Sequence, residues 1–296
     1  MNKIVLLTLF GLLLAMVACK SDENQKKKVD LPQDKEEQKA PDDEPRNEEV
    51  YSIPSPNEQY DLLRALGGEL KQGTVNELSN VSEYSTRQKK ALNFGVYLSD
   101  AAYLMRYDQG KKVFLDYVST LDKLGRDLDI TKVYGEELLK EVEEIGADSE
   151  RLFELTSDNY LTVYDQMIDN GKGSDLTLIL GGSWIETMHI LFATSGEFEE
   201  NYEIQEYIVD QKYILQNLIG FASAYDDDED VAKLIEDLEA IQTAYEELDC
   251  KESSLEVEQE EGDVMVLSGG SACLFTASSY KNMKSLIKEI RSSIVS

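Results

Sequence analysis

The chain has 296 residues, which is enough for one large domain or two small ones. It contains 59 acidic and 29 basic residues, so its formal net charge at pH 7 is −30. A charge of this sign repels nucleic-acid backbones and anionic lipid headgroups, and we therefore expect no nucleic acid as a partner. It favours a basic partner, a cation or simply a well-solvated helical surface.

The N-terminal segment has the three parts of a secretory signal peptide. Lys3 provides a positive charge, residues 4–17 form an apolar run broken only by one Thr and one Gly, and Ala18 places a small residue before Cys19. The run is shorter than the roughly 20 residues that a membrane-spanning helix needs. We therefore predict a signal peptide over residues 1–18 rather than a permanent transmembrane anchor.

Cys19 favours the lipoprotein form of this signal, although Met16 departs from the leucine usual in bacterial lipoproteins. Lipidation at Cys19 with acyl chains such as palmitate would hold the protein stably on a bilayer, because two or more chains suffice for this. The alternative is an ordinary signal peptide with a chance cysteine. Residues 20–23, Lys-Ser-Asp-Glu, resemble the short tract that follows the lipidated cysteine in surface-exported lipoproteins of the Bacteroidota. We expect an outer-membrane location, facing either the periplasm or the cell surface.

Residues 19–50 are rich in Lys, Asp, Glu, Gln and Pro and contain almost no apolar side chains. Such a segment cannot bury enough surface to offset the entropy lost on ordering. We predict a disordered tether over residues 19–50, followed by an ordered domain over residues 51–296.

Helical spacing of apolar residues dominates this domain. Ser55 can cap a first helix that Pro56 opens, and Gly67-Gly68 ends it. Apolar residues then recur three and four positions apart in eight further segments: 86–107, 111–128, 136–145, 149–168, 174–193, 202–225, 228–248 and 278–295. Short separators favour antiparallel neighbours, so we predict an all-α, antiparallel bundle of about seven to nine helices. A regular α-solenoid is the lesser option, because no fixed-period repeat is present.

One segment departs from helical spacing. Residues 250–261 are acidic and rich in Ser, and residues 263–267 are typical of a short strand or an extended loop. We predict one irregular acidic loop here, near the C-terminus. Cys250 and Cys273 flank it and can form a disulfide in an oxidising compartment; two unpaired buried thiols are the alternative.

Three patterns resemble catalytic or metal sites and fail in detail. Glu186 and His189 have the spacing of di-iron bundle ligands, but His189 is the only histidine in the chain. Residues 226–230 begin like a calcium loop, yet Val231 stands where that loop requires Gly, so acids that cap a helix are the better interpretation. Residues 181–183, Gly-Gly-Ser, lack the final glycine of a hydrolase elbow. We predict no catalytic residues, no metal and no cofactor.

The most distinctive polar group lies on a single predicted helix. Asn93, Tyr97 and Asp100 are three and four residues apart and therefore share one face. If that face points inward, these residues form a buried polar network. The alternative is a small-ligand site in an interhelical cleft, to which Glu186 would also contribute.

Four stretches resemble an uncharacterised family of helical lipoproteins from the Bacteroidota. They are Ile53-Pro54-Ser55-Pro56; Lys90-Ala91-Leu92-Asn93 with Gly95-Val96-Tyr97 and Asp100; Gly181-Gly182-Ser183-Trp184-Ile185-Glu186; and Ile290-Arg291-Ser292-Ser293-Ile294-Val295. The resemblance extends from about residue 51 to the C-terminus. Since the family carries no assigned activity, the resemblance implies only a helical fold and a location in the cell envelope. The acidic segment near Cys250 departs from the family's pattern.

Together these features predict a non-enzymatic lipoprotein, anchored to a membrane through its N-terminal lipid, whose helical domain binds an envelope protein partner. The second hypothesis is a lipoprotein that binds a small ligand in the cleft described above.

Overall fold

The protein is described from a computed structural model, which describes residues 52–130, 136–146, 148–260 and 264–296. The predicted signal peptide (1–18), Cys19 and the predicted tether (19–50) lie outside the described residues. The described residues belong to one compact unit.

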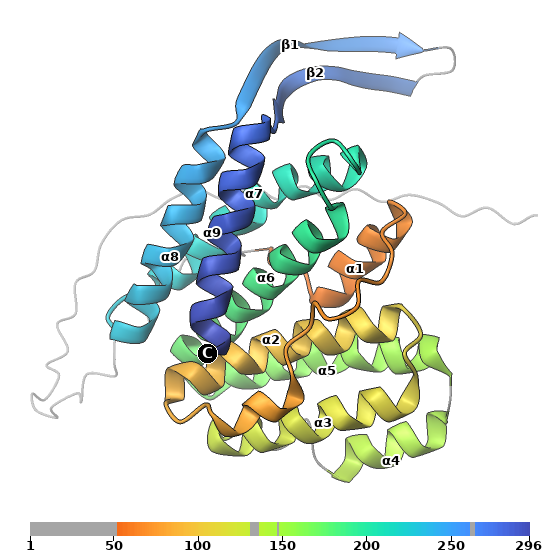
Figure 1. Ribbon diagram of the computed structural model, residues 1–296, viewed down its shortest axis with the longest axis vertical. Helices are drawn as coiled ribbons and strands as arrows, with labels where there is room; N and C mark the ends of the chain where they lie inside the picture. The colour runs from red at the N-terminus through yellow and green to blue at the C-terminus, as the bar shows by residue number, and fades with distance from the viewer. Residues whose placement is uncertain (1–51, 131–135, 147, 261–263) are drawn as a thin grey trace, which may run out of the picture. The chain divides into compact units, whose positions relative to one another are not determined.

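Nine α-helices, one short 3₁₀ helix and one β-hairpin make up the described ranges (Figure 1). This confirms the all-α multi-helix fold. The elements in chain order are α1 (Pro56–Ala65), η1 (Leu78–Ser82), α2 (Arg87–Arg106), α3 (Gly110–Asp127), α4 (Glu136–Ile145), α5 (Ser149–Asp169), α6 (Gly173–Ser195), α7 (Tyr202–Ser223), α8 (Glu229–Glu246), β1 (Asp249–Glu260), β2 (Val264–Leu274) and α9 (Ala277–Val295).

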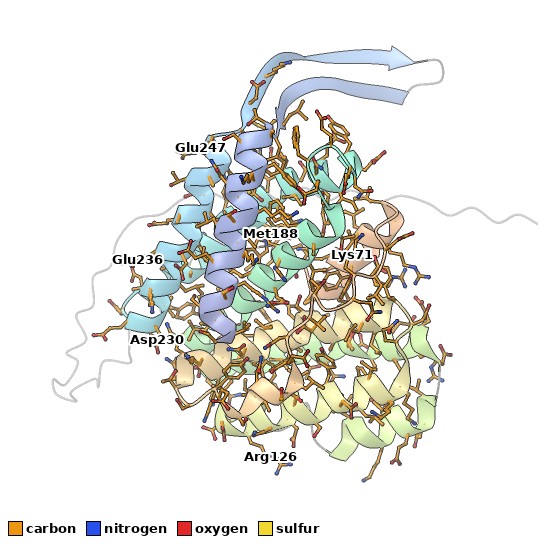
Figure 2. All side chains as sticks on the ribbon, viewed as in Figure 1. Lys71, Arg126, Met188, Asp230, Glu236 and Glu247 are labelled. Atoms are coloured by element: carbon orange, nitrogen blue, oxygen red, sulfur yellow. A yellow bond between two sulfur atoms is a disulfide. The ribbon has the colours of Figure 1, made fainter. Side chains whose placement is uncertain are left out.

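Helix α6 is the central element of the bundle, and it packs against α2, α7 and α9 (Figure 1). Among the described residues it is the one helix long and apolar enough to cross a membrane, but 89% of its most apolar window is buried inside the protein. Met188 illustrates this position, because its side chain lies among the helices and is fully buried (Figure 2). A helix that is apolar nearly all round is buried in this way at the centre of a large domain.

Two glycines let the backbones of α2 and α6 touch. A Cβ atom added to Gly182 would lie 2.0 Å from the carbonyl oxygen of Leu92, and one added to Gly95 would lie 2.0 Å from that of Ile179. Neither distance is compatible with a side chain. The close approach of the two central helices therefore requires glycine at both positions.

Side-chain caps begin several helices where the sequence predicted them. Ser55 and Glu58 form a capping box at α1: Glu58 N–H donates to Ser55 Oγ, and Ser55 N–H donates to Glu58 Oε2. At α8, Asp228 accepts hydrogen bonds from the backbone N–H groups of Asp230 and Val231 at 3.0 and 3.4 Å. The acidic run at 226–230 thus stabilises the positive end of a helix, as the capping interpretation predicts.

The prediction of an irregular acidic loop is wrong, because β1 and β2 pair as an antiparallel hairpin. Its register places Val257 opposite Leu267 and Cys250 opposite Cys273, with an irregularity between Ser253 and Glu256. The alternation typical of a strand is hard to recognise in β1, because apolar and polar residues alternate only over residues 255–258 of its 12 residues. The structure joins Cys250 and Cys273 by a disulfide at the base of the hairpin. Helix α7 contacts β2, and Figure 1 shows the rest of the hairpin extending away from the helices.

Replacement of Gly182 by Ala should lower the free energy of unfolding by about 3 kcal/mol, since the new methyl group overlaps the backbone of α2. Urea denaturation followed by circular dichroism measures this loss. Gly171→Ala is the matched control: its φ is +68° and nothing lies within 4 Å of the added Cβ, so it carries only a backbone cost of about 1 kcal/mol. Equal losses for the two variants would contradict the proposed close contact.

Replacement of both Cys250 and Cys273 by Ser should loosen the hairpin and leave the helices intact. By lowering the entropy of the unfolded chain, the disulfide stabilises the folded state by about 3 kcal/mol. We expect limited proteolysis to cut the double variant within residues 249–274 several times faster than the parent, while the helical circular dichroism stays the same. Unchanged cleavage rates would show that contacts other than the disulfide hold the strands together.

Candidate functional site: a buried ionic network

Helices α2, α6 and α9 meet at a cluster of buried polar side chains. Asn93, Tyr97 and Asp100 come from one face of α2, and Glu186 comes from α6; all four are fully buried. The side chains of Asp100 and Glu186 are within hydrogen-bonding contact of each other. The close helix contact at Gly95 and Gly182, one or two turns away, brings these two carboxyl groups together.

Arg291 from α9 binds Glu186 with two parallel hydrogen bonds. Its Nε lies 2.8 Å from Glu186 Oε2 and its Nη2 lies 3.0 Å from Glu186 Oε1. This bidentate geometry is the strongest form of an arginine–carboxylate contact. Nη2 also donates to the carbonyl oxygen of Thr74 at 3.3 Å. The guanidinium group therefore joins the last helix both to the centre of the bundle and to the segment that precedes α2.

The segment between α1 and α2 completes the network. Asn76 N–H donates to Asp100 Oδ2 at 3.0 Å, and Asn76 Nδ2 donates to the hydroxyl of Tyr84 and to Asn93 Oδ1. Tyr97 donates its hydroxyl hydrogen to the carbonyl oxygen of Glu77 at 2.9 Å. These bonds hold the segment between α1 and α2 over the ends of the polar side chains. The segment therefore covers one side of the network.

The electrostatics of the two carboxyl groups differ. Burial, followed by the charge of Glu186, holds the pKa of Asp100 well above its usual value. Burial also raises the pKa of Glu186, while the Arg291 guanidinium opposes that increase. Asp100 Oδ1 receives no hydrogen bond from a protein donor. We infer that Asp100 is protonated and donates a hydrogen bond from Oδ1 to Glu186, whose negative charge is balanced by Arg291.

His189 lies one turn beyond Glu186 on α6. Burial, with the nearby charge of Arg291, lowers the pKa of His189 to about 4, so that its imidazole is neutral at pH 7. Within the described residues, no group of three or more His, Cys, Asp or Glu side chains is arranged to hold a metal ion. The predicted Glu186 and His189 spacing is thus realised on one helix, without a third ligand among the described side chains.

A second set of hydroxyl groups lies beside the ionic network. Tyr60 and Ser99 hydroxyls are 2.6 Å apart, and Ser99 is 3.0 Å from the Thr187 hydroxyl. Burial raises the pKa of Tyr60 and that of Tyr97, so both hydroxyl groups stay protonated at pH 7. Ser183, from the Gly-Gly-Ser pattern, lies inside helix α6 and not on a turn between a strand and a helix.

The arrangement is an internal network and not the lining of an open cleft. All four predicted residues are shielded from solvent, and each forms a hydrogen bond within the protein, with Asn76, with Arg291 or with a backbone carbonyl group. Chemically, the network can hold one proton between two carboxyl groups and neutralise one buried charge. Sequence reasoning did not identify Arg291, Asn76 or Tyr84 as its partners. The one available signal was Arg291, a cation between the apolar residues Ile290 and Ile294 on the inward face of α9.

Comparison of the chain with protein-family models, with curated proteins and with solved structures gave no match. What is established is therefore the class of fold, a multi-helix all-α domain with one disulfide-linked hairpin.

Replacement of Glu186 by Gln should destabilise the protein far more than replacement of Asp100 by Asn. The first change leaves the charge of Arg291 without its partner and should cost about 3–5 kcal/mol. The second replaces a protonated carboxyl by an amide of the same shape, which still donates to Glu186, and should cost about 1 kcal/mol or less. Urea denaturation at pH 7 ranks the two. Equal losses would contradict a protonated Asp100.

The stability of the parent relative to Asp100→Asn should fall as pH rises. The folded pKa of Asp100 lies above the unfolded value of about 3.9, so the folded state binds the extra proton. Its stabilising contribution is complete at low pH and is lost as pH increases from about 4 towards the folded pKa. The free energy of unfolding of both proteins should be measured at pH 5 and at pH 8. His189 is present in both, so its opposite contribution cancels in the difference. A difference independent of pH would contradict the raised pKa.

Proposed function

We propose that this protein is a lipid-anchored lipoprotein of the bacterial cell envelope. Its helical domain binds a protein partner and catalyses no reaction. The single observation that carries the proposal is the apolar N-terminal run that ends at Cys19. The disulfide between Cys250 and Cys273 supports it, because disulfides persist in oxidising compartments outside the cytoplasm.

Two features support a role in partner binding. The hairpin forms a two-stranded sheet, so within the described residues each strand leaves one edge without a strand partner. Such edges are where an extended segment of another protein can add. The second feature is the large negative charge, which steers basic partners towards the protein.

The alternative function, binding of a small ligand beside Asp100 and Glu186, has less support. Both side chains are fully buried and are bonded within the protein. A ligand would have to displace the bidentate contact of Arg291 to reach them, and an unpaired buried charge is costly.

Membrane fractionation and cross-linking test the proposal. The parent protein should sediment with membranes and carry the mass of its acyl chains, whereas Cys19→Ala should lose both properties. Mild cross-linking of the tagged parent in native membranes should recover one envelope protein in stoichiometric amount, and the yield should drop in Cys19→Ala at matched expression. Membrane association that survives Cys19→Ala would overturn lipid anchoring, and recovery of the parent alone would overturn partner binding.

A further inference from the structure

An open hollow of about 180 Å³ lies where the base of the hairpin meets the start of α7. Three aromatic side chains line it. Phe198 lies in the turn between α6 and α7, Tyr202 lies in α7, and Phe275 directly follows β2. The carboxylates of Glu199 and Glu206 belong to the same lining. None of the residues that line the hollow is basic.

The floor of the hollow is a buried aromatic side chain that packs against other rings. The buried ring of Phe275 packs edge-on against Phe192 and Tyr280, with ring centroids 6.2 and 5.4 Å apart. Such aromatic pairs contribute beyond their buried area. Tyr202, by contrast, is 50% exposed and donates a hydrogen bond to Glu206 one turn along α7. The hollow thus has a fixed aromatic floor and one aromatic wall that faces solvent.

The backbone that carries Glu199 is also held in place. Gln205 bridges the turn, because its Nε2 donates to the carbonyl oxygen of Glu197 and its Oε1 accepts from Glu199 N–H. Glu199 has a φ of +69°, in the left-handed region that favours glycine. Glycine occupies such a conformation three residues earlier, at Gly196. A glutamate at this position costs backbone energy, and strain of this kind is concentrated at binding sites.

The chemistry of the lining selects a cation. Aromatic faces attract an ammonium or guanidinium group through their quadrupoles, and carboxylates form charge-assisted hydrogen bonds with it. The protein's charge of −30 adds long-range attraction for the same sign of partner. Because the hollow is open to solvent, a cationic side chain on the surface of another protein can reach it.

We propose that this hollow receives a lysine or arginine side chain of a protein partner that docks at the base of the hairpin. The proposal rests on the partner-binding function above and names the chemistry that the partner must present. Leu274, the last residue of β2, belongs to the lining, so a partner seated here also contacts the hairpin.

A titration with labelled tetra-arginine peptide tests the site on the purified domain. The double variant Glu199→Gln with Glu206→Gln should lower the affinity for the peptide about tenfold, since it removes two charge-assisted contacts. The matched control is Glu203→Gln with Asp210→Asn, which removes the same charge from exposed positions of α7 outside the lining. The control should change the affinity by less than about twofold. Equal losses in the two double variants would overturn the site, because they would show attraction to overall charge only.

A single variant distinguishes the effect of the carboxylate on binding from an effect on folding. Glu199→Gly removes the carboxylate and suits the left-handed backbone, so the protein should remain folded and bind the peptide several-fold more weakly. Binding equal to that of the parent would overturn a role for Glu199.

The cross-linking experiment in native membranes distinguishes this inference from the proposed function. If the parent recovers a partner and the Glu199→Gln, Glu206→Gln variant recovers it equally well, the hollow is not the docking site and the proposed function stands. If the variant remains anchored but loses the partner, the hollow is supported. If the parent recovers no partner, the proposed function fails, and the peptide titration still decides whether the hollow binds a cation.

Discussion

The backbone contact between α2 and α6 is the constraint on which the rest of the structure depends. Gly95 and Gly182 bring the helix axes so close that no side chain fits between them. Side chains that follow on the same faces are then forced to meet, which is why Asp100 and Glu186 share one buried site. Helices α1, α3 and α5 contact α2, whereas α7, α8 and α9 contact α6.

A close contact of this kind buries polar groups that water would otherwise solvate, which costs free energy. The network offsets this cost with few charges. Burial raises the pKa of Asp100 and so favours its neutral form, and one guanidinium balances Glu186. Buried ionic groups of this kind seldom add net stability compared with apolar side chains, but they penalise arrangements that separate the partners. The network therefore mainly selects one arrangement of the helices over others. The apolar residues around it supply most of the stability.

The sequence predicts the local elements of this fold well and its long-range contacts poorly. Periodicity and caps identify the helices, since Ser55 and Glu58 act within a single turn. The shared face of Asn93, Tyr97 and Asp100 likewise follows from helical geometry. Arg291 lies 105 positions from Glu186, and no local pattern links such residues. The short-strand alternative for residues 263–267 agrees with β2, but β1 was missed because it contains few apolar residues. The aromatic hollow was missed because a turn, a helix and a strand end contribute its walls.

The separation of Glu186 from Arg291 also has a temporal meaning. A ribosome synthesises the carboxylate 105 residues before the cation that balances it. Until α9 has emerged, burial of α6 would leave an uncompensated charge, which is strongly unfavourable. The growing chain is thus discouraged from closing its core early, and α2 and α6 should engage fully only when α9 is available. Full burial of Glu186 is therefore expected only once Arg291 can reach it.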